Sequence, residues 1–314
     1  MKNFFLILMM VTFSLYVYGQ TCCSAGASIS SSLDITAQDS RTWAVQLGYE
    51  YKSINLLIND NQRLTNDPRS RSGQNGSLKV DFALSEHWAF SALLPLVYQE
   101  RSTISENQNS FGIGDLMLLA QYSLFFGESS KLSFTGGLKT PTGIIDQTGT
   151  SNILLSPDMQ SGSGSYDYLV RLALIRDDFV IPYLSGFISS TYRNNGINNN
   201  FGQTASFPGR RFGFGDEIII ASGLSYLWTT KHGFVSPDLK LRYRRSDPNV
   251  EQNTIAPNSG GNWLSLPLGV SFTPGVNSTY RLYTEIPLYQ SLTGLQITTD
   301  FTVGLQFNYT FNKK

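Results

Sequence analysis

The residue types that most often carry out catalysis are few in this chain of 314 residues, and their spacing does not fit a catalytic site. The two histidines, His87 and His232, each lie in a short polar segment between apolar stretches. A Ser–His pair would need a histidine beside a serine on a neighbouring strand, and neither histidine fits that arrangement. The sequence also contains no phosphate-binding loop and no HExxH motif. We therefore predict that the protein is not an enzyme and uses no cofactor.

The two cysteines, Cys22 and Cys23, are adjacent and lie close to the N-terminus. Adjacent cysteines rarely bridge each other, so they could form intermolecular disulfides, bind a soft metal or have no role. No second cluster of Cys or His is present to complete a metal site of the usual kind. The two cysteines are weak candidates for metal ligands, and we predict no metal site.

Basic side chains at alternating positions are the remaining feature with a chemical consequence. Lys240, Arg242 and Arg244 alternate with apolar or aromatic residues. Because the side chains of a β-strand point alternately to its two faces, the three basic groups would form a row on one face. A row of this kind can filter anionic or polar solutes, so its role depends on the elements that carry it.

The composition of the chain indicates a β-rich protein. Charged residues make up 15% of the sequence, below the roughly 25% of an ordinary soluble domain, and the mean hydropathy is −0.13. Aromatic residues make up 13%, and there are 28 glycines, which favours strands joined by many turns. The 23 basic and 23 acidic residues cancel, which argues against nucleic-acid binding because that function needs a basic excess.

Alternation of apolar and polar residues recurs along the chain after residue 40. In the first segment, for example, Trp43, Val45 and Leu47 alternate with small or polar residues. Twelve such segments are predicted as strands, at about residues 43–51, 78–84, 88–99, 114–125, 131–139, 165–175, 179–190, 217–229, 234–244, 263–272, 279–289 and 299–311. The connections between them alternate between short and long.

These patterns predict an all-β fold, a transmembrane up-and-down antiparallel β-barrel of about 12 strands. Only helices and closed barrels can satisfy the backbone inside a membrane, and no apolar run after residue 40 approaches the roughly 20 residues of a spanning helix. Tight turns at one end and long loops at the other are typical of outer-membrane barrels, with the short turns in the periplasm and the long loops outside the cell.

In such a barrel, alternate side chains face the lipid and the lumen. The predicted lumen set has eight basic and five acidic side chains: Glu50, Lys52, Lys79, Asp81, Lys139, Asp167, Arg171, Asp238, Lys240, Arg242, Arg244, Arg281 and Glu285. All of these except Glu50, Lys52, Lys139 and Asp238 are our candidates for a solute path. The charges could act as a filter, or they could pair across strands and brace the interior. We slightly favour bracing, because opposite charges are available.

The ends of the chain predict export and assembly. Residues 1–19 have the basic and apolar regions of a signal peptide, with Gly19 at the cleavage site. Residues 20–41 would form a periplasmic tail or a plug in the lumen, and their polarity favours the tail. Residues 42–311 are predicted as the barrel and 312–314 as a C-terminal extension. Phe311 nearly ends the chain and resembles the terminal aromatic residue that outer-membrane proteins present to the barrel-assembly machinery.

Four motifs stand at predicted strand and loop boundaries: Gly112–Leu116, Gly137–Gly143, Gly162–Tyr168, and Pro287–Gln290 followed by Gly294–Gln296. Their main positions are Gly114, Asp115, Pro141, Gly143, Asp167, Gln290 and Gly294. Through these motifs, residues 42–311 resemble the outer-membrane transporters of the meta-pathway of phenol degradation family. The resemblance implies a barrel that passes small, often apolar or aromatic, molecules across the outer membrane, and it does not identify the solute.

We therefore expect a channel or transporter for small molecules in the cell outer membrane, passive or gated. Its solute could be apolar, aromatic or anionic, and its other partners would be outer-membrane lipid and the barrel-assembly machinery. Two alternatives remain open. The protein could be a structural or adhesive barrel that binds a partner through its long loops, or a secreted soluble β-protein.

Overall fold

The structure, a computed structural model, describes residue 33 and residues 40–65, 67–104, 106–149, 152–205 and 208–311. The predicted signal peptide, the two cysteines, the C-terminal extension and most of segment 20–41 lie outside the described residues. Among the described residues, no helix has the length and apolar character needed to span a membrane. One short 3-10 helix, η2 (Pro157–Met159), is present in that part of the chain.

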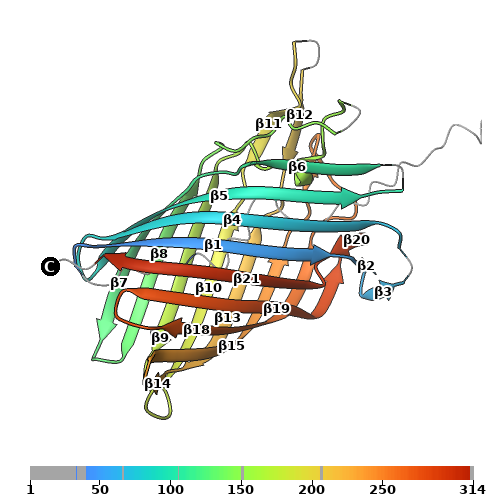
Figure 1. The fold of residues 1–314 in the computed structure, drawn as a ribbon. Helices are drawn as coiled ribbons and strands as arrows, with labels where there is room; N and C mark the ends of the chain where they lie inside the picture. The colour runs from blue at the N-terminus through green and yellow to red at the C-terminus, as the bar shows by residue number, and fades with distance from the viewer. Residues whose placement is uncertain are drawn as a thin grey trace, which may run out of the picture.

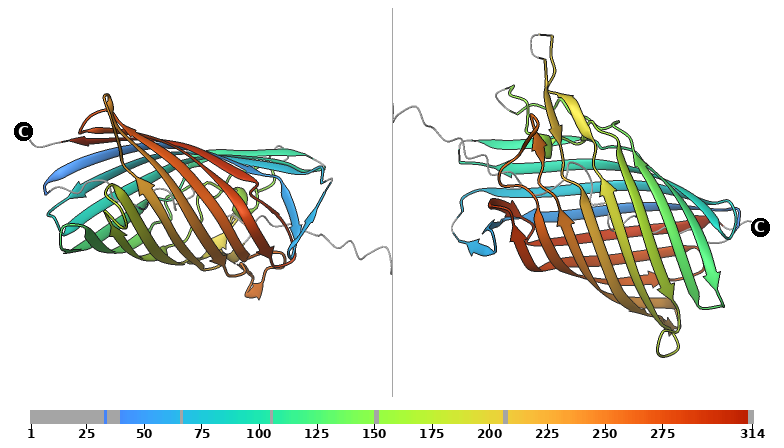
Figure 2. Two further views of the ribbon diagram at one scale, coloured as in Figure 1. Left: turned by 90° about the horizontal axis from the view of Figure 1, so that it is seen from below. Right: turned by 180° about the vertical axis from the view of Figure 1, so that it is seen from behind.

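Twelve antiparallel strands form a closed barrel (Figure 1, Figure 2). Each strand pairs with its neighbours in the chain, and the first strand pairs with the last from Trp43↔Phe311 to Ser53↔Phe301, which closes the circle. The strands are β1 (Thr42–Ile54), β4 (Ser70–Ala83), β5 (Trp88–Ser102), β7 (Met117–Phe126), β8 (Ser130–Lys139), β9 (Asp167–Arg176), β10 (Leu184–Asn194), β13 (Glu217–Tyr226), β15 (Gly233–Ser246), β18 (Gly261–Thr273), β19 (Ser278–Leu292) and β21 (Phe301–Phe311). The predicted fold class is confirmed.

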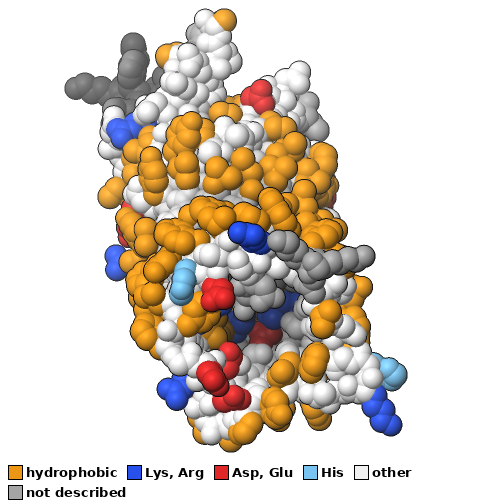
Figure 3. All heavy atoms as spheres, turned by 90° about the vertical axis from the view of Figure 1, so that its left-hand side faces the viewer, with side chains coloured by type: hydrophobic (Ala, Val, Ile, Leu, Met, Phe, Trp, Pro, Cys, Tyr) orange, Lys and Arg blue, Asp and Glu red, His pale blue; other side chains and the backbone are white. Residues whose placement is uncertain are grey.

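Apolar side chains cover much of the outer face of the barrel wall (Figure 3). In β1, Trp43, Leu47 and Tyr49 are about half exposed, whereas Ala44 and Glu50 are 1% and 6% exposed. Antiparallel ladders satisfy the backbone groups of the wall, and the outward side chains are those that hydrocarbon tolerates. The period of two in the sequence therefore separates an apolar outer face from a polar inner face.

Short turns join the strands at one end of the barrel and long segments join them at the other (Figure 1). The short connections span residues 84–87, 127–129, 177–183, 227–232 and 274–277, and both histidines lie in them. The long connections span residues 55–69, 103–116, 140–166, 195–216, 247–260 and 293–300. This asymmetry is the one that the sequence predicted.

The connections also contain short strands, most of which the periodicity did not predict; the exception is β14 (Trp228–Thr230), which overlaps the end of the strand predicted at 217–229. A three-stranded sheet joins β2 (Leu56–Asn59), β3 (Gln62–Leu64) and β20 (Leu295–Thr298), and a four-stranded sheet joins β11 (Ile197–Phe201), β12 (Arg210–Gly213), β16 (Val250–Glu251) and β17 (Thr254–Ile255). β6 (Asn107–Ile113) pairs with β5, and β14 pairs with β15. Most of these strands have two to five residues, which is too short to show a period.

Two strand boundaries differ from the prediction by several residues. The strand predicted at 179–190 begins at Leu184, because Asp178 and Tyr183 have positive φ angles and Pro182 has no N–H to donate. The strand predicted at 78–84 begins at Ser70, because its polar first half pairs with both β1 and β5. Local backbone geometry therefore sets the start of β10, whereas pairing with neighbouring strands sets the start of β4.

Candidate functional site

The long segment between β8 and β9, residues 140–166, folds back against the inside of the barrel. Its Leu155, Met159 and Gln160 are at most 2% exposed. Asp158 forms ion pairs with Arg71 of β4 at 2.6 Å and with Arg101 of β5 at 3.5 Å. A buried carboxylate is costly unless it is paired, so these two arginines hold the segment against the wall.

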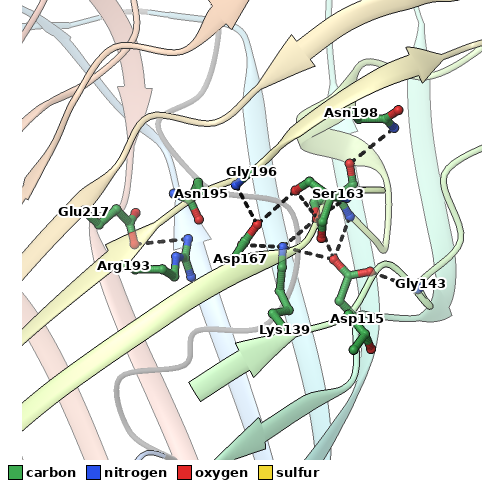
Figure 4. Close-up of polar contacts among 12 residues, drawn as sticks. Asp115, Lys139, Gly143, Ser163, Asp167, Arg193, Asn195, Gly196, Asn198 and Glu217 are labelled. Carbon is green, nitrogen blue, oxygen red and sulfur yellow. Dashed lines mark hydrogen bonds and ion pairs between the residues drawn. The ribbon is translucent and has the colours of Figure 1, made fainter. Parts of the chain in front are cut away.

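A buried polar network joins this segment to β8, β9 and the start of β7 (Figure 4). Asp115 accepts hydrogen bonds from the Gly143 N–H at 2.9 Å, the Ser163 N–H at 2.9 Å and the Ser163 hydroxyl at 2.7 Å. The Nζ of Lys139 lies 3.1 Å from the Asp115 carboxylate and 2.6 Å from that of Asp167. The Ser165 hydroxyl donates to Asp167 at 2.9 Å. We call Asp115, Lys139, Ser163, Ser165 and Asp167 the loop-anchoring network, and all five are buried.

Three of the four sequence motifs meet in the loop-anchoring network. They supply Asp115, then Lys139 with Gly143, then Ser163 with Asp167. A Cβ added to Gly143 would lie 2.6 Å from the Cα of Gly162, a separation that real Cβ atoms do not show. Glycine is required where two backbones approach this closely. The motif residues therefore make the contacts that pack segment 140–166 against the wall.

The other motif positions lie around this network or at a separate loop contact. The Gly114 N–H donates to the Pro95 carbonyl at 2.9 Å, and Pro141 lies in the bend that follows β8. On β19, the Gln290 side chain donates to the Thr299 carbonyl at 2.9 Å, and Gly294 has a φ of +74° in the following turn. The fourth motif therefore shapes the connection between β19 and β21, away from the loop-anchoring network.

Lys79 and Asp81, two predicted solute-path residues, form an ion pair at 3.3 Å on β4. Each is 1% exposed, and Asp81 also accepts a hydrogen bond from the Ser91 hydroxyl at 2.6 Å. They are not among the residues that line the cavity described next. Lys79 and Asp81 therefore form a buried ion pair that stabilises the inner face of β4.

A second group of charged residues lines an open space of about 80 Å³ inside the barrel, which we call the lumen cavity. Its lining includes five predicted solute-path residues, Arg171, Lys240, Arg242, Arg281 and Glu285, together with Glu50. These side chains come from β1, β9, β15 and β19. Figure 3 shows that the short-turn end of the barrel is hollowed, with Lys, Arg, Asp and Glu side chains inside the hollow.

The charged groups of the lumen cavity form ion pairs within and across strands. Arg281 donates to Asp238 at 2.7 and 2.8 Å, and Lys240 lies 3.7 Å from the same carboxylate. Arg242 forms an ion pair with Glu285. These side chains keep part of their surface open, since Lys240, Arg242 and Arg281 are 18% to 26% exposed. These basic side chains are therefore paired and still partly accessible from the cavity.

Aromatic rings accompany the basic groups. The Nζ of Lys240 lies 5.1 Å from the ring centroid of Phe187, and the Arg244 guanidinium lies 4.7 Å from that of Trp263. These distances permit cation–π attraction. Arg244 also forms an ion pair with Glu217, whose carboxylate lies 3.1 Å from Arg193. The predicted row on β15 is thus divided, because Lys240 and Arg242 line the cavity and Arg244 is held by Glu217.

Two residues of this arrangement were missed from the sequence. Glu217 stands at the first position of a predicted strand, and counting back in steps of two from the inward residues of β13 would have placed it inside. Arg193 lies in β10 but fell in a segment predicted as a loop, so no strand parity was assigned to it. The structure brings both to the inner face.

Leu33 is the described residue of segment 20–39, and it lies inside the barrel. It is 3% exposed and packs with Leu93, Met117, Leu119 and Leu169, on the inner face of β5, β7 and β9. It also lines the lumen cavity. Leu33 therefore adjoins both the apolar inner face and the cavity.

The two histidines lie outside the loop-anchoring network and the lining of the lumen cavity. No group of three or more His, Cys, Asp or Glu side chains that could hold a metal ion occurs among the described residues. His87 contacts the Ser123 carbonyl through Nδ1 at 2.8 Å, and His232 is exposed in its turn. Cys22 and Cys23 lie outside the described residues.

Comparison with known proteins finds similarity in structure and not in sequence. No family model matches the chain, and no curated protein matches it. The COG4313 outer membrane channel from Pseudomonas putida F1 is similar with a TM-score of 0.72 at 14% identity, over 88% of this chain and 98% of that chain. The β domain of the Bordetella autotransporter BrkA gives a TM-score of 0.48 at 12% identity, over 87% of this chain and 100% of that one. The chain shares the barrel fold of the Pseudomonas channel.

Proposed function

We propose that the protein is an outer-membrane channel that passes small molecules through the barrel interior. The observation that carries this proposal is the lumen cavity, a charged and open space enclosed by a wall with an apolar outer face. A barrel that served only as a scaffold could fill its interior completely with side chains, as small barrels do. We also propose that it belongs to the meta-pathway of phenol degradation family, which the meeting of three motifs in the loop-anchoring network supports.

The proposed location is the outer membrane, reached with a signal peptide at residues 1–19 and with the barrel-assembly machinery. The apolar outer face of the barrel and the short-turn and long-loop ends support this location. The terminal strand β21 ends at Phe311, which is about half exposed and pairs with Trp43 in the barrel seam. That position leaves the aromatic ring on the outer face. An assembly factor could bind the ring there before β21 pairs with β1 and closes the barrel.

We further propose that the segment before β1 acts as a plug and not as a periplasmic tail. Leu33 lies in the lumen and lines the cavity, which supports this proposal.

Cell fractionation and liposome swelling test the proposed function. We expect a heat-modifiable band that only detergent extracts, and proteoliposomes that swell in small neutral solutes faster than empty liposomes. Recovery of the protein in the aqueous supernatant would support a secreted soluble β-protein instead. A membrane-inserted barrel that causes no swelling, even with residues 20–39 deleted, would support a closed scaffold whose long loops bind a partner.

A further inference from the structure

We infer that the lumen cavity binds a small uncharged polyol, and that Glu50 accepts a hydrogen bond from one of its hydroxyl groups. The inference deepens the proposed function, on which it rests, because it names the class of solute that the channel holds in its path. It follows from an unsatisfied carboxylate oxygen in the cavity lining, from the side chain that fixes this carboxylate and from the ion pairs that share the cavity.

The carboxylate of Glu50 lines the lumen cavity, and the residue is 6% exposed. Its Oε2 accepts a hydrogen bond from the Tyr283 hydroxyl at 2.8 Å. Among the described residues, no group donates a hydrogen bond to its Oε1. The Nζ of Lys52 lies 3.8 Å from this oxygen, which is within the range of an ion pair and too long for a hydrogen bond. Glu50 therefore has a charge partner, and its Oε1 lacks a hydrogen-bond donor.

Tyr283 fixes the Glu50 carboxylate because a glycine leaves room for its ring. Gly304 of β21 is the register partner of Glu50 on one side and of Tyr283 on the other. A Cβ added to Gly304 would overlap the Tyr283 ring, so the ring lies across this position. With Oε2 bound to Tyr283, Oε1 is the oxygen left for a molecule in the cavity. A buried carboxylate oxygen without a donor is costly, and a hydroxyl group in the cavity would remove this cost.

The ion pairs of the cavity favour an uncharged ligand. Arg281 and Lys240 both pair with Asp238. Arg242 pairs with Glu285. A charged solute would separate one of these pairs or remain without a partner in an interior partly removed from water, and both are costly. A hydroxyl group brings no net charge, and it both donates and accepts hydrogen bonds. It can therefore donate to the unsatisfied carboxylate oxygen while the ion pairs stay intact.

The rest of the lining suits both parts of a polyol. Ser189 and Thr191 of β10 line the cavity, and their hydroxyl groups belong to a type that donates and accepts. Phe187 and Pro267 line it as well, and they offer apolar surface to C–H groups. A Cβ added to Gly223 would lie 2.7 Å from the Phe187 ring, so this ring lies against the backbone of β13. A hydrocarbon would leave the polar lining unmatched, whereas a polyol matches both kinds of surface.

Equilibrium binding to the purified full-length protein in detergent, followed by NMR, tests this inference with glycerol as the probe. Ethylene glycol dimethyl ether is its counterpart with the same number of non-hydrogen atoms and no hydroxyl group. We expect glycerol to bind at least about tenfold more tightly than the ether, the ratio expected for one hydrogen bond to a charged group. Serinol has an ammonium in place of the central hydroxyl, and glycerate has a carboxylate at one end. Neither ion should bind more tightly than glycerol.

Variants of Glu50 assign the preference to this carboxylate. In Glu50→Gln the Tyr283 hydroxyl still has an oxygen to bind, and an amide N–H would replace Oε1. Glycerol should then bind about tenfold more weakly, and its preference over the ether should fall. Tyr283→Phe should cause a smaller loss, because Oε1 of Glu50 remains available. The matched control is Glu251→Gln, the same change in β16 at the long-loop end, where Glu251 pairs with Arg210 at 3.0 Å. It should bind glycerol like the wild type. Heat-modifiability checks the folding of each variant.

Equal affinities for glycerol and the ether would overturn the inference, as would tighter binding of serinol or glycerate. Equal losses in Glu50→Gln and Tyr283→Phe would also overturn it, because Glu50 would then serve only to hold Tyr283.

Planar-bilayer conductance separates these outcomes from the failure of the proposed function. A protein that conducts small ions but does not prefer glycerol is a channel without this site. A protein that binds glycerol as expected but neither conducts ions nor swells liposomes has the site and is not a channel.

Discussion

The loop-anchoring network and the lumen cavity both contain acidic and basic side chains but differ in how these charges are satisfied. In the network, Asp115 accepts hydrogen bonds from two backbone N–H groups and a serine hydroxyl in addition to its pair with Lys139. In the cavity, Lys240, Arg242 and Arg281 are paired but 18% to 26% exposed. Ion pairing alone therefore does not separate a structural charge from one that can bind a solute. A structural charge differs from a charge that can bind a solute in the number of hydrogen bonds it makes and in its access to open space.

The largest effect on this comparison should come from Asp115→Ala. The substitution leaves Lys139 with one carboxylate fewer and removes the acceptor of the Gly143 and Ser163 N–H groups. Breaking a buried pair typically costs about 3–5 kcal/mol, so we expect a loss of this size in urea unfolding in detergent. Asp146→Ala, an exposed change in the same segment, should remain within about 0.5 kcal/mol of the wild type. Equal losses would show that the network does not anchor the segment.

A smaller loss of stability is expected from Gly143→Ala. Its Cβ would lie 2.6 Å from the Cα of Gly162, so the backbone of segment 140–166 would have to move. Overpacking of this kind costs about 1–3 kcal/mol. Gly136→Ala on β8 is the matched control, because nothing lies within 4 Å of its added Cβ. The same unfolding measurement applies, and a neutral Gly143→Ala would argue that the motif spacing has another origin.

Leu33→Asp tests whether the cavity is closed from the periplasmic side by the segment before β1. A carboxylate among Leu93, Met117, Leu119 and Leu169 would be unfavourable, because these side chains offer it no hydrogen bond. Loss of one buried leucine, about 2 kcal/mol, shifts the bound-to-released ratio of the segment more than tenfold. Swelling in neutral solutes should therefore be faster. Leu33→Met should swell like the wild type, and an unchanged rate in Leu33→Asp would argue against the plug.

The smallest predicted effect is a salt dependence confined to the cavity. The basic side chains that line the cavity should give a preference for anions in reversal-potential measurements, and this preference should decrease from 0.1 M to 1 M KCl. Over that range the Debye length falls from about 10 Å to about 3 Å. Lys240→Gln should reduce the preference at low salt and leave the stability of the loop-anchoring network unchanged. A preference that is equal at both salt concentrations would argue against an electrostatic origin.

The fold could be predicted because a membrane barrel repeats one simple pattern. Trp43, Leu47 and Tyr49 lie outside and Glu50 inside, as the period of two requires, and the unequal connection lengths distinguished the two ends of the barrel. The candidate site was predicted only in part. The row of Lys240, Arg242 and Arg244 was placed on one face, but its division between the cavity and Glu217 depends on a strand that is distant in the chain. Arg193 was missed because its segment shows no clear alternation.

The sequence by itself determined the barrel, the two faces of each strand and the set of charges available to the interior, because these follow from local alternation. Only the tertiary structure decided which charges hold the inward-folded segment and which face open space. Asp115 meets Ser163 and Asp158 meets Arg71 across long stretches of chain, and the inward fold of residues 140–166 occupies one side of the lumen. That division leaves the cavity on the β15 side, where Lys240 and Arg242 remain accessible.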